Sequence, residues 1–258
     1  MNLEKAIGIH VTRKRKFGFP CLETRSIYKS QILRSIKTYM IMKKILFNDK
    51  YRLTQAVLEG RKTMTRRIVA DKKLHYWKCS CPDMVIVKVP ESQKLKTDDD
   101  NTYFGIKDKI SSEYYCDTIT SPYKVGEVVA IAQSYGDCGN MPDYELDEDG
   151  YPIMPKRSGF FNKMFVRADL MPHHIRITNI KIERLQNISD EDCFKEGIYK
   201  GQCGSADTHF MDVYYYKGDI QPYCTPREAF AVLIDKISGK GTWSSNPYVF
   251  VYEFELVD

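Results

Sequence analysis

The chain has 258 residues, with 39 lysines and arginines, 34 aspartates and glutamates, and 43% hydrophobic residues. This composition is typical of a globular protein with a sizeable core, and it excludes a disordered or a collagen-like chain. No stretch approaches the roughly 18 consecutive apolar residues that span a bilayer, and residues 1–30 lack the apolar core of a signal peptide. We therefore expect a cytoplasmic protein with no membrane segment.

The positive charge is concentrated at the N-terminus. Residues 1–44 hold eleven basic residues against two acids, a net charge of +9, and the other 214 residues hold 28 basic against 32 acidic residues, a net charge of −4. We predict a basic extension over residues 1–42 whose composition is compatible with disorder. It is either an arm that binds RNA or an upstream segment outside the working protein, because Met40 and Met42 stand just before Lys43.

The eight cysteines are expected to be reduced, because the sequence has no signal peptide. Among them, Cys79, Cys81 and Cys116 form the one candidate metal cluster, together with His75. Cys79 and Cys81 are one residue closer than the cysteine pairs of zinc sites, and Cys116 has no second thiol nearby. No nucleotide-binding glycine motif is present either. We expect no metal and no cofactor.

In the first half, a helix over about 49–59 is predicted, because apolar residues recur at helical spacing between a cap at Asn48 or Asp49 and Gly60. An extended segment over 62–69 follows, then an insertion of hairpins over about 72–122. The continuous apolar run over 128–132 predicts a strand buried on both faces. Residues 136–162 are rich in glycine, proline and acids, and a loop is expected there.

In the second half, strands are predicted over 164–169 and 175–185. In the longer one, Ile175 and Ile177 have the opposite parity to Ile180 and Ile182, which predicts a β-bulge near Thr178.

The remaining elements end with a strand. Ser189 caps a short helix that ends at Glu196 before Gly197, and a loop follows over about 199–224. Thr225 begins a capping box and a longer helix, and residues 248–257 alternate as a strand. Five or six strands with short helices and no βαβ rhythm predict an α+β protein built on a small β-barrel.

The segment from Gly60 to Arg67 contains four cations and two hydroxyls. Lys62 and Thr65 are a known type of base and nucleophile pairing, provided that burial leaves the lysine neutral. Arg66 and Arg67 are suited to phosphates. The alternative is a basic edge strand that prevents aggregation.

These features resemble the ASCH domain, a PUA-like β-barrel family, and in particular its larger prophage-associated and Bacteroidetes-type members. The resemblance rests on the first helix with the segment Gly60-Arg61-Lys62-Thr63-Met64-Thr65-Arg66-Arg67, the turn at 123–127, the helix at 188–197 and the aromatic last strand. It implies a domain over residues 43–258 with insertions at about 72–122, 136–162 and 199–224.

The resemblance also implies a cleft that binds RNA or a small nucleoside, and it assigns candidate site residues. Small bacterial members are amidohydrolases that deacetylate N4-acetylcytidine, and their catalytic residues match Lys62, Thr65 and Glu196. Thr65 would attack the amide carbonyl, Lys62 would accept its proton, and Glu196 would orient Lys62 or protonate the leaving amine. We expect Arg61, Arg66, Arg67 and Gln133 to contact the ligand or RNA.

One departure puts the substrate in question. Many large members carry the run Trp-Val-Arg-Glu-Thr-Trp on the strand that here reads Ala130 to Tyr135. The cation and the carboxylate of that run are therefore absent here, and Gln133 lies within it. Three hypotheses remain open: a module that binds RNA or a modified nucleoside, an amidohydrolase of N4-acylated cytidines, and a catalytically silent phage-derived interaction protein.

Overall fold

The computed structural model describes residues 42–70, 72, 74, 76–77, 84–90, 101–108, 117–139, 148–149, 159–204 and 209–257. By its internal contacts the chain divides into the units Met1–Ile41 and Met42–Asp258, and the first unit lies outside the described residues. The basic extension therefore stays a prediction. The same holds for the candidate metal cluster, because His75, Cys79, Cys81 and Cys116 also lie outside the described residues.

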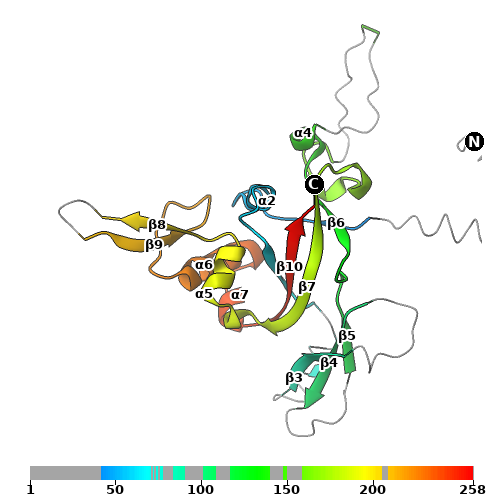
Figure 1. Cartoon of the computed structure of the whole chain (residues 1–258), viewed down its shortest axis with the longest axis vertical. Coiled ribbons are helices and arrows are strands. Elements are labelled where there is room, and N and C mark those ends of the chain that lie inside the picture. Colours follow the sequence, from blue (N-terminus) through cyan, green and yellow to red (C-terminus); the bar gives the residue numbers. More distant parts are fainter. Residues whose placement is uncertain are drawn as a thin grey trace, which may run out of the picture. The chain divides into compact units, whose positions relative to one another are not determined.

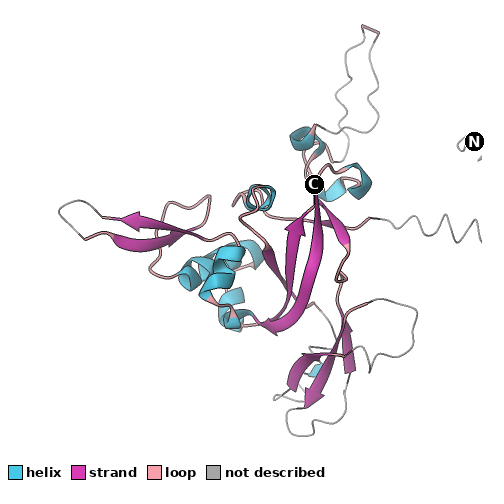
Figure 2. Ribbon diagram, in the orientation of Figure 1, coloured by secondary structure: helices cyan, strands magenta, loops and turns pink. Residues whose placement is uncertain are grey.

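The fold is α+β, as predicted, with strands in separate sheets and mostly short helices (Figure 1, Figure 2). The main sheet has the strand order β1 (Lys44–Ile45), β6 (Val128–Ile131), β7 (His174–Arg184), β10 (Tyr248–Leu256) and β2 (Met64–Ile68). Only the β1–β6 pair in this sheet is parallel. The smaller sheets are β3 (Met84–Lys88) with β4 (Tyr103–Asp108) and β5 (Asp117–Thr120), and β8 (Tyr199–Cys203) with β9 (Met211–Tyr215).

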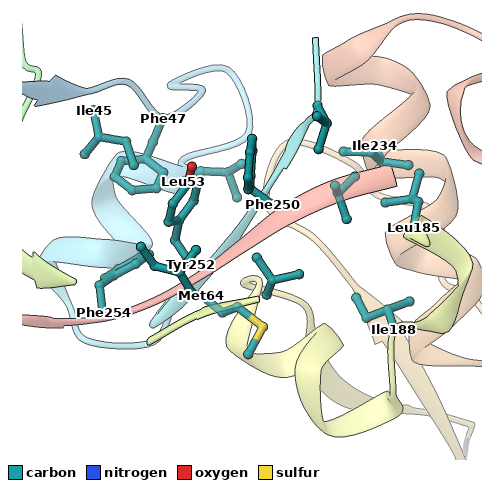
Figure 3. Packing of buried hydrophobic residues seen from close by; sticks show 14 of the residues in the cluster. Ile45, Phe47, Leu53, Met64, Leu185, Ile188, Ile234, Phe250, Tyr252 and Phe254 are labelled. Atoms are coloured by element: carbon teal, nitrogen blue, oxygen red, sulfur yellow. The ribbon is translucent and has the colours of Figure 1, made fainter. Parts of the chain in front are cut away.

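The described helices are α2 (Leu53–Leu58), α4 (Tyr135–Cys138), α5 (Asp190–Lys195), α6 (Pro226–Ser238) and α7 (Thr242–Ser245), with short 3-10 turns at Lys163–Phe165, Ala168–Leu170 and Leu185–Asn187. None of them has the length and apolar character that crossing a bilayer requires. The core lies between the main sheet and the helices α2, α5 and α6. Figure 3 shows Ile234 of α6 near Leu185, and both belong to the same buried cluster as Ile188, which precedes α5.

The β-bulge predicted from the isoleucine pattern is present. Glu253 of β10 pairs with Asn179, whereas Phe254 pairs with Ile177, so Thr178 is an extra residue on β7. Ile177 and Ile180 are both buried although their spacing is odd. The bulge is what brings both ends of β7 into the core with the correct parity.

The two edge strands of the main sheet approach each other. β1 and β2 stand at opposite ends of the strand order, yet Arg67 of β2 donates a hydrogen bond to the carbonyl of Leu46, the residue after β1. The ring of Phe47 lies 5.8 Å from that of Phe254 on β10. Among the described residues no backbone hydrogen bond joins β1 to β2. The sheet is therefore strongly curled, and the side chain of Arg67 fastens its edges together.

Helices α5 and α6 begin at the predicted caps. The Ser189 hydroxyl accepts a hydrogen bond from the backbone N–H of Asp192, and Thr225 forms the complete capping box with Glu228. Gly197 follows α5 with φ of +103°, a conformation that favours glycine. These caps fix where α5 starts and ends, and so where Glu196 lies.

Two local predictions in the first half are wrong about where the element begins. The helix predicted over about 49–59 is present as α2. α2 begins only at Leu53, because residues 49–52 form a turn that ends at Arg52 with φ of +50°. Asp49 therefore does not cap the helix, and its carboxylate accepts a hydrogen bond from the Thr54 hydroxyl. The loop predicted over 136–162 begins with the short helix α4, capped by Ser134, and most of its other residues lie outside the described ranges.

Two predictions in the second half are also wrong. Residues 164–169 form 3-10 turns instead of a strand, because the Asn162 side chain accepts a hydrogen bond from the N–H of Met164 and starts a turn. The loop expected over 199–224 contains the hairpin β8–β9, in which the rings of Tyr199 and Tyr215 stack 5.5 Å apart. Such cross-strand pairs stabilise a hairpin, although the glycines of this segment had favoured the prediction of a loop.

Deleting Thr178 should unfold or severely destabilise the protein. Removing one residue turns one of the two isoleucine sets, at 175 and 177 or at 180 and 182, towards solvent. Each buried isoleucine contributes roughly 1.5–3 kcal/mol, so a loss of at least about 3 kcal/mol is expected in urea unfolding. The control is Thr178→Ala, which keeps the residue count at an exposed position and should change stability by less than about 0.5 kcal/mol. Equal effects of the two changes would contradict this account.

Candidate functional site

A buried lysine–glutamate pair joins the segment before β2 to the end of α5. Glu196 is the C-terminal cap residue of α5, and the N–H of Thr63 donates to the carbonyl of Lys195 at 3.0 Å. Lys62 Nζ lies 2.6 Å from Glu196 Oε2 and also donates to the Glu196 carbonyl at 2.9 Å. The exposed fractions of the two side chains are only 2% and 5%. Two segments 134 residues apart in the sequence thus meet through one ion pair.

Arg66 binds the other oxygen of the same carboxylate. Its Nη1 lies 3.2 Å from Glu196 Oε1, and its Nη2 lies 2.8 Å from both Glu183 Oε1 and Asp192 Oδ2. The side chain is fully buried, and its Nε is one of two buried side-chain polar atoms without a hydrogen-bond partner in the described part of the chain. Arg66 is thus held by three carboxylates and is not available to a phosphate.

The pKa of Lys62 is lowered from its ordinary value. Burial is the largest influence, and it lowers the pKa of Lys62 because a buried ammonium loses its hydration. Glu196 opposes this shift, whereas the positive charges of Arg67 and Arg66 add to it. For Arg66 burial also works against the charge, but its carboxylate partners prevail and raise its pKa. Lys62 is therefore the member of this group best placed to give up its proton.

These side chains line a cavity of about 200 Å³, which we call the Lys62 cavity. Thr65 is buried with an exposed fraction of 5%, and its hydroxyl makes no hydrogen bond with the residues that the structure describes. The remaining walls are largely apolar and come from the segment after β1, from α2 and from α6: Leu46, Phe47, Leu53, Phe230, Leu233, Ile234 and Ile237. A free hydroxyl, a lysine of lowered pKa and a carboxylate thus share one partly apolar space.

The structure brings together five of the seven predicted site residues. Lys62, Thr65, Arg66, Arg67 and Glu196 all line the Lys62 cavity. The other two do not line it. Arg61 is exposed and pairs with Glu59 at 2.5 Å, and Gln133 lines a separate cavity of about 490 Å³ beside Asp49, Arg52 and Thr54.

Two carboxylates of the site were not predicted from the sequence. They belong to Asp192 and Glu183. Asp192 lies four residues before Glu196 on the same helix face, and this spacing could have indicated it. Glu183 lies on β7, and nothing in its surrounding sequence indicates a contact with Arg66. Both acids have the same effect, which is to hold Arg66 inside the protein.

No group of three potential metal ligands comes together within the described ranges. The Lys62 cavity offers one carboxylate, and that carboxylate is already bound by two cations.

Comparisons with known proteins leave the family open. No family model matches the sequence, and no curated protein matches it. Among solved structures, the chain is similar to the crystal structure of an Enterococcus faecalis V583 protein described by the family model DUF984. The sequence identity is 16%, the match covers 92% of this chain and 90% of that chain, and the TM-score is 0.31. A TM-score this low supports no argument about fold or function.

The sharing of Glu196 predicts unequal effects of two substitutions. Glu196→Gln removes the carboxylate from two buried cations at once, and should lower the free energy of unfolding by about 3 kcal/mol or more. Lys62→Met leaves Glu196 paired with Arg66 and replaces a buried ammonium by an apolar chain of similar length, so it should cost at most about 1 kcal/mol. Urea unfolding at neutral pH measures both values. A larger loss for Lys62→Met than for Glu196→Gln would show that the carboxylate is not shared as described.

Proposed function

We propose that this chain is an ASCH-type, PUA-like domain whose Lys62 cavity binds an N4-acylated cytidine-like nucleoside and hydrolyses its amide bond. The observation that carries the proposal is the buried pair of Lys62 and Glu196, 2.6 Å apart, in a cavity that Thr65 also lines. The curled sheet supports the PUA-like part, because a barrel needs its edge strands to approach.

The reaction would proceed in two steps. Thr65 Oγ1 attacks the acyl carbonyl carbon while neutral Lys62 Nζ accepts the hydroxyl proton, and the tetrahedral species expels the amine, which takes that proton from Lys62. The acyl group is then an ester of Thr65. Water attacks this ester, Lys62 accepts a proton from the water and returns it to Thr65, and the carboxylic acid leaves. The products from N4-acetylcytidine are cytidine and acetate.

Glu196 and Arg66 would act on Lys62 by position and charge. Lys62 Nζ donates two hydrogen bonds to Glu196, so Lys62 would have to release one of them to accept a proton from Thr65. Arg66 holds the other carboxylate oxygen, which keeps Glu196 in place during that movement. Catalytic hydrogen bonds of this kind often form only in the substrate complex.

A second candidate function is binding without hydrolysis. It is favoured by the absence of a hydrogen bond between Lys62 and Thr65 among the described contacts of both residues. The ligand would be a nucleoside or single-stranded RNA. Arg66 is bound by carboxylates and cannot bind phosphates. The cavity therefore offers RNA fewer cations than a typical RNA-binding surface does.

The test is hydrolysis of N4-acetylcytidine, followed by chromatography of the released cytidine. Wild-type protein should release cytidine, and Thr65→Val should reduce the rate at least about 1000-fold because it removes only the nucleophilic oxygen. The matched control is Thr63→Val, a half-buried threonine two residues earlier that does not line the cavity. It should retain wild-type activity.

The outcome separates the hypotheses. Release by wild type and by Thr63→Val but not by Thr65→Val supports hydrolysis. No release from a panel of N4-acyl cytidines contradicts it and leaves binding, or, if cytidines do not bind either, a catalytically silent interaction protein.

A further inference from the structure

One wall of the Lys62 cavity is formed by a single face of helix α6. Phe230, Leu233, Ile234 and Ile237 line the cavity, and their spacing of three and four residues places them on the same face of the helix. The first three are buried in the main hydrophobic cluster, whereas Ile237 is half-buried and packs against that cluster. None of the four side chains can form a hydrogen bond. This wall therefore favours an apolar group of a ligand.

The cavity is larger than an acetyl group requires. Its volume is about 200 Å³, and an apolar cavity of roughly 150 Å³ with walls of leucine, isoleucine and phenylalanine accommodates benzene. The methyl carbon of an acetyl group would leave most of the α6 wall without contact, and contacts that are not made contribute no dispersion energy. A group of about six carbon atoms matches this space better.

The proposed reaction decides which half of an amide substrate lies in the cavity. The acyl half becomes an ester of Thr65 and stays attached through both steps, whereas the amine half leaves after the first step. Thr65 lines the same cavity as the α6 wall, so the acyl group that it carries lies against that wall.

We propose that the Lys62 cavity is an acyl site, and that the acyl group it takes is an apolar chain or ring of about five to seven carbon atoms packed against α6. This inference rests on the proposed function and names its acyl group, which the ASCH resemblance implies to be acetyl. The reaction itself is unchanged. Thr65 takes the acyl group from the amide nitrogen, the amine leaves with a proton, and water releases the longer carboxylic acid. Ile237, at the half-buried part of the wall, determines the acyl length.

The first experiment is an NMR titration of the full chain with acetamide, butanamide and hexanamide, which carry the acyl half of a substrate and no nucleoside. Each fully buried methylene group strengthens binding about fourfold, so hexanamide should bind at least about 10-fold more tightly than acetamide. Ile237→Trp fills the space beside α6 and should abolish this preference. The control Ile237→Leu keeps the side-chain volume and should retain the preference.

A smaller side chain keeps the test decisive if Ile237→Trp does not fold. Wild type should bind octanamide no more tightly than hexanamide, because the cavity is then full. Ile237→Ala lengthens the cavity and should bind octanamide more tightly than hexanamide.

Several results would overturn the inference. Equal binding of acetamide and hexanamide by wild type would do so without any variant, and so would no detectable binding of either amide. A full hexanamide preference in folded Ile237→Trp would show that the chain binds elsewhere. The same relative affinity for octanamide in wild type and in Ile237→Ala would contradict the role of Ile237.

The inference and the proposed function fail in different ways, and hydrolysis rates of N4-acetylcytidine and N4-hexanoylcytidine separate them. Faster hydrolysis of the hexanoyl compound supports both. Faster hydrolysis of the acetyl compound keeps the reaction and contradicts the acyl site. If hexanamide is preferred through Ile237 but neither cytidine is hydrolysed, the apolar binding site stands and the chemistry does not.

Discussion

Glu196 is shared by two buried cations, and the rest of the site depends on that sharing. One carboxylate oxygen meets Lys62 and the other meets Arg66, whose guanidinium also holds Asp192 and Glu183. Buried ions are stable only with such partners. Separating β2 from α5 would therefore be costly, because it would leave a buried charge unpaired or expose it to solvent. The same contacts fix the lysine in the cavity that Thr65 also lines. The ion pairs that stabilise the packing of β2 against α5 therefore also position the lysine of the candidate site.

The curled main sheet explains why there is a cavity at this position. Its edge strands approach without pairing in the described residues, and Arg67 bridges them by a hydrogen bond to Leu46. A complete ladder would have closed the gap that the Lys62 cavity occupies. The bulge at Thr178 contributes to the curvature, because a β-bulge increases local twist. The Lys62 cavity is thus a consequence of incomplete closure.

Much of the local structure could be predicted because its signals are local. The capping box at Thr225, the cap at Ser189 and the parity change in β7 each lie within a few residues of sequence. The same locality explains the errors. The turn before α2 and the pairing of β8 with β9 depend on contacts between residues whose own sequences favour loops.

The site could be predicted only in part. The motif at 60–67 indicated Lys62, Thr65, Arg66 and Arg67, and resemblance added Glu196. The roles of the two arginines could not be predicted, because they are set by tertiary partners. Arg66 meets three carboxylates, whereas the adjacent Arg67 points to a carbonyl and meets none in the described part of the chain. Adjacent residues of a strand face opposite sides, and the sequence does not say which side holds the acids.

The most direct test of this account is the pKa of Lys62, followed by NMR of the side-chain carbon next to Nζ and assigned by comparison with Lys62→Met. Burial and the two neighbouring arginines predict a pKa clearly below the usual value of about 10.4 for lysine. A Lys62 resonance that titrates at or above that value would mean that its ammonium is solvated or fully stabilised by Glu196, and would contradict the account.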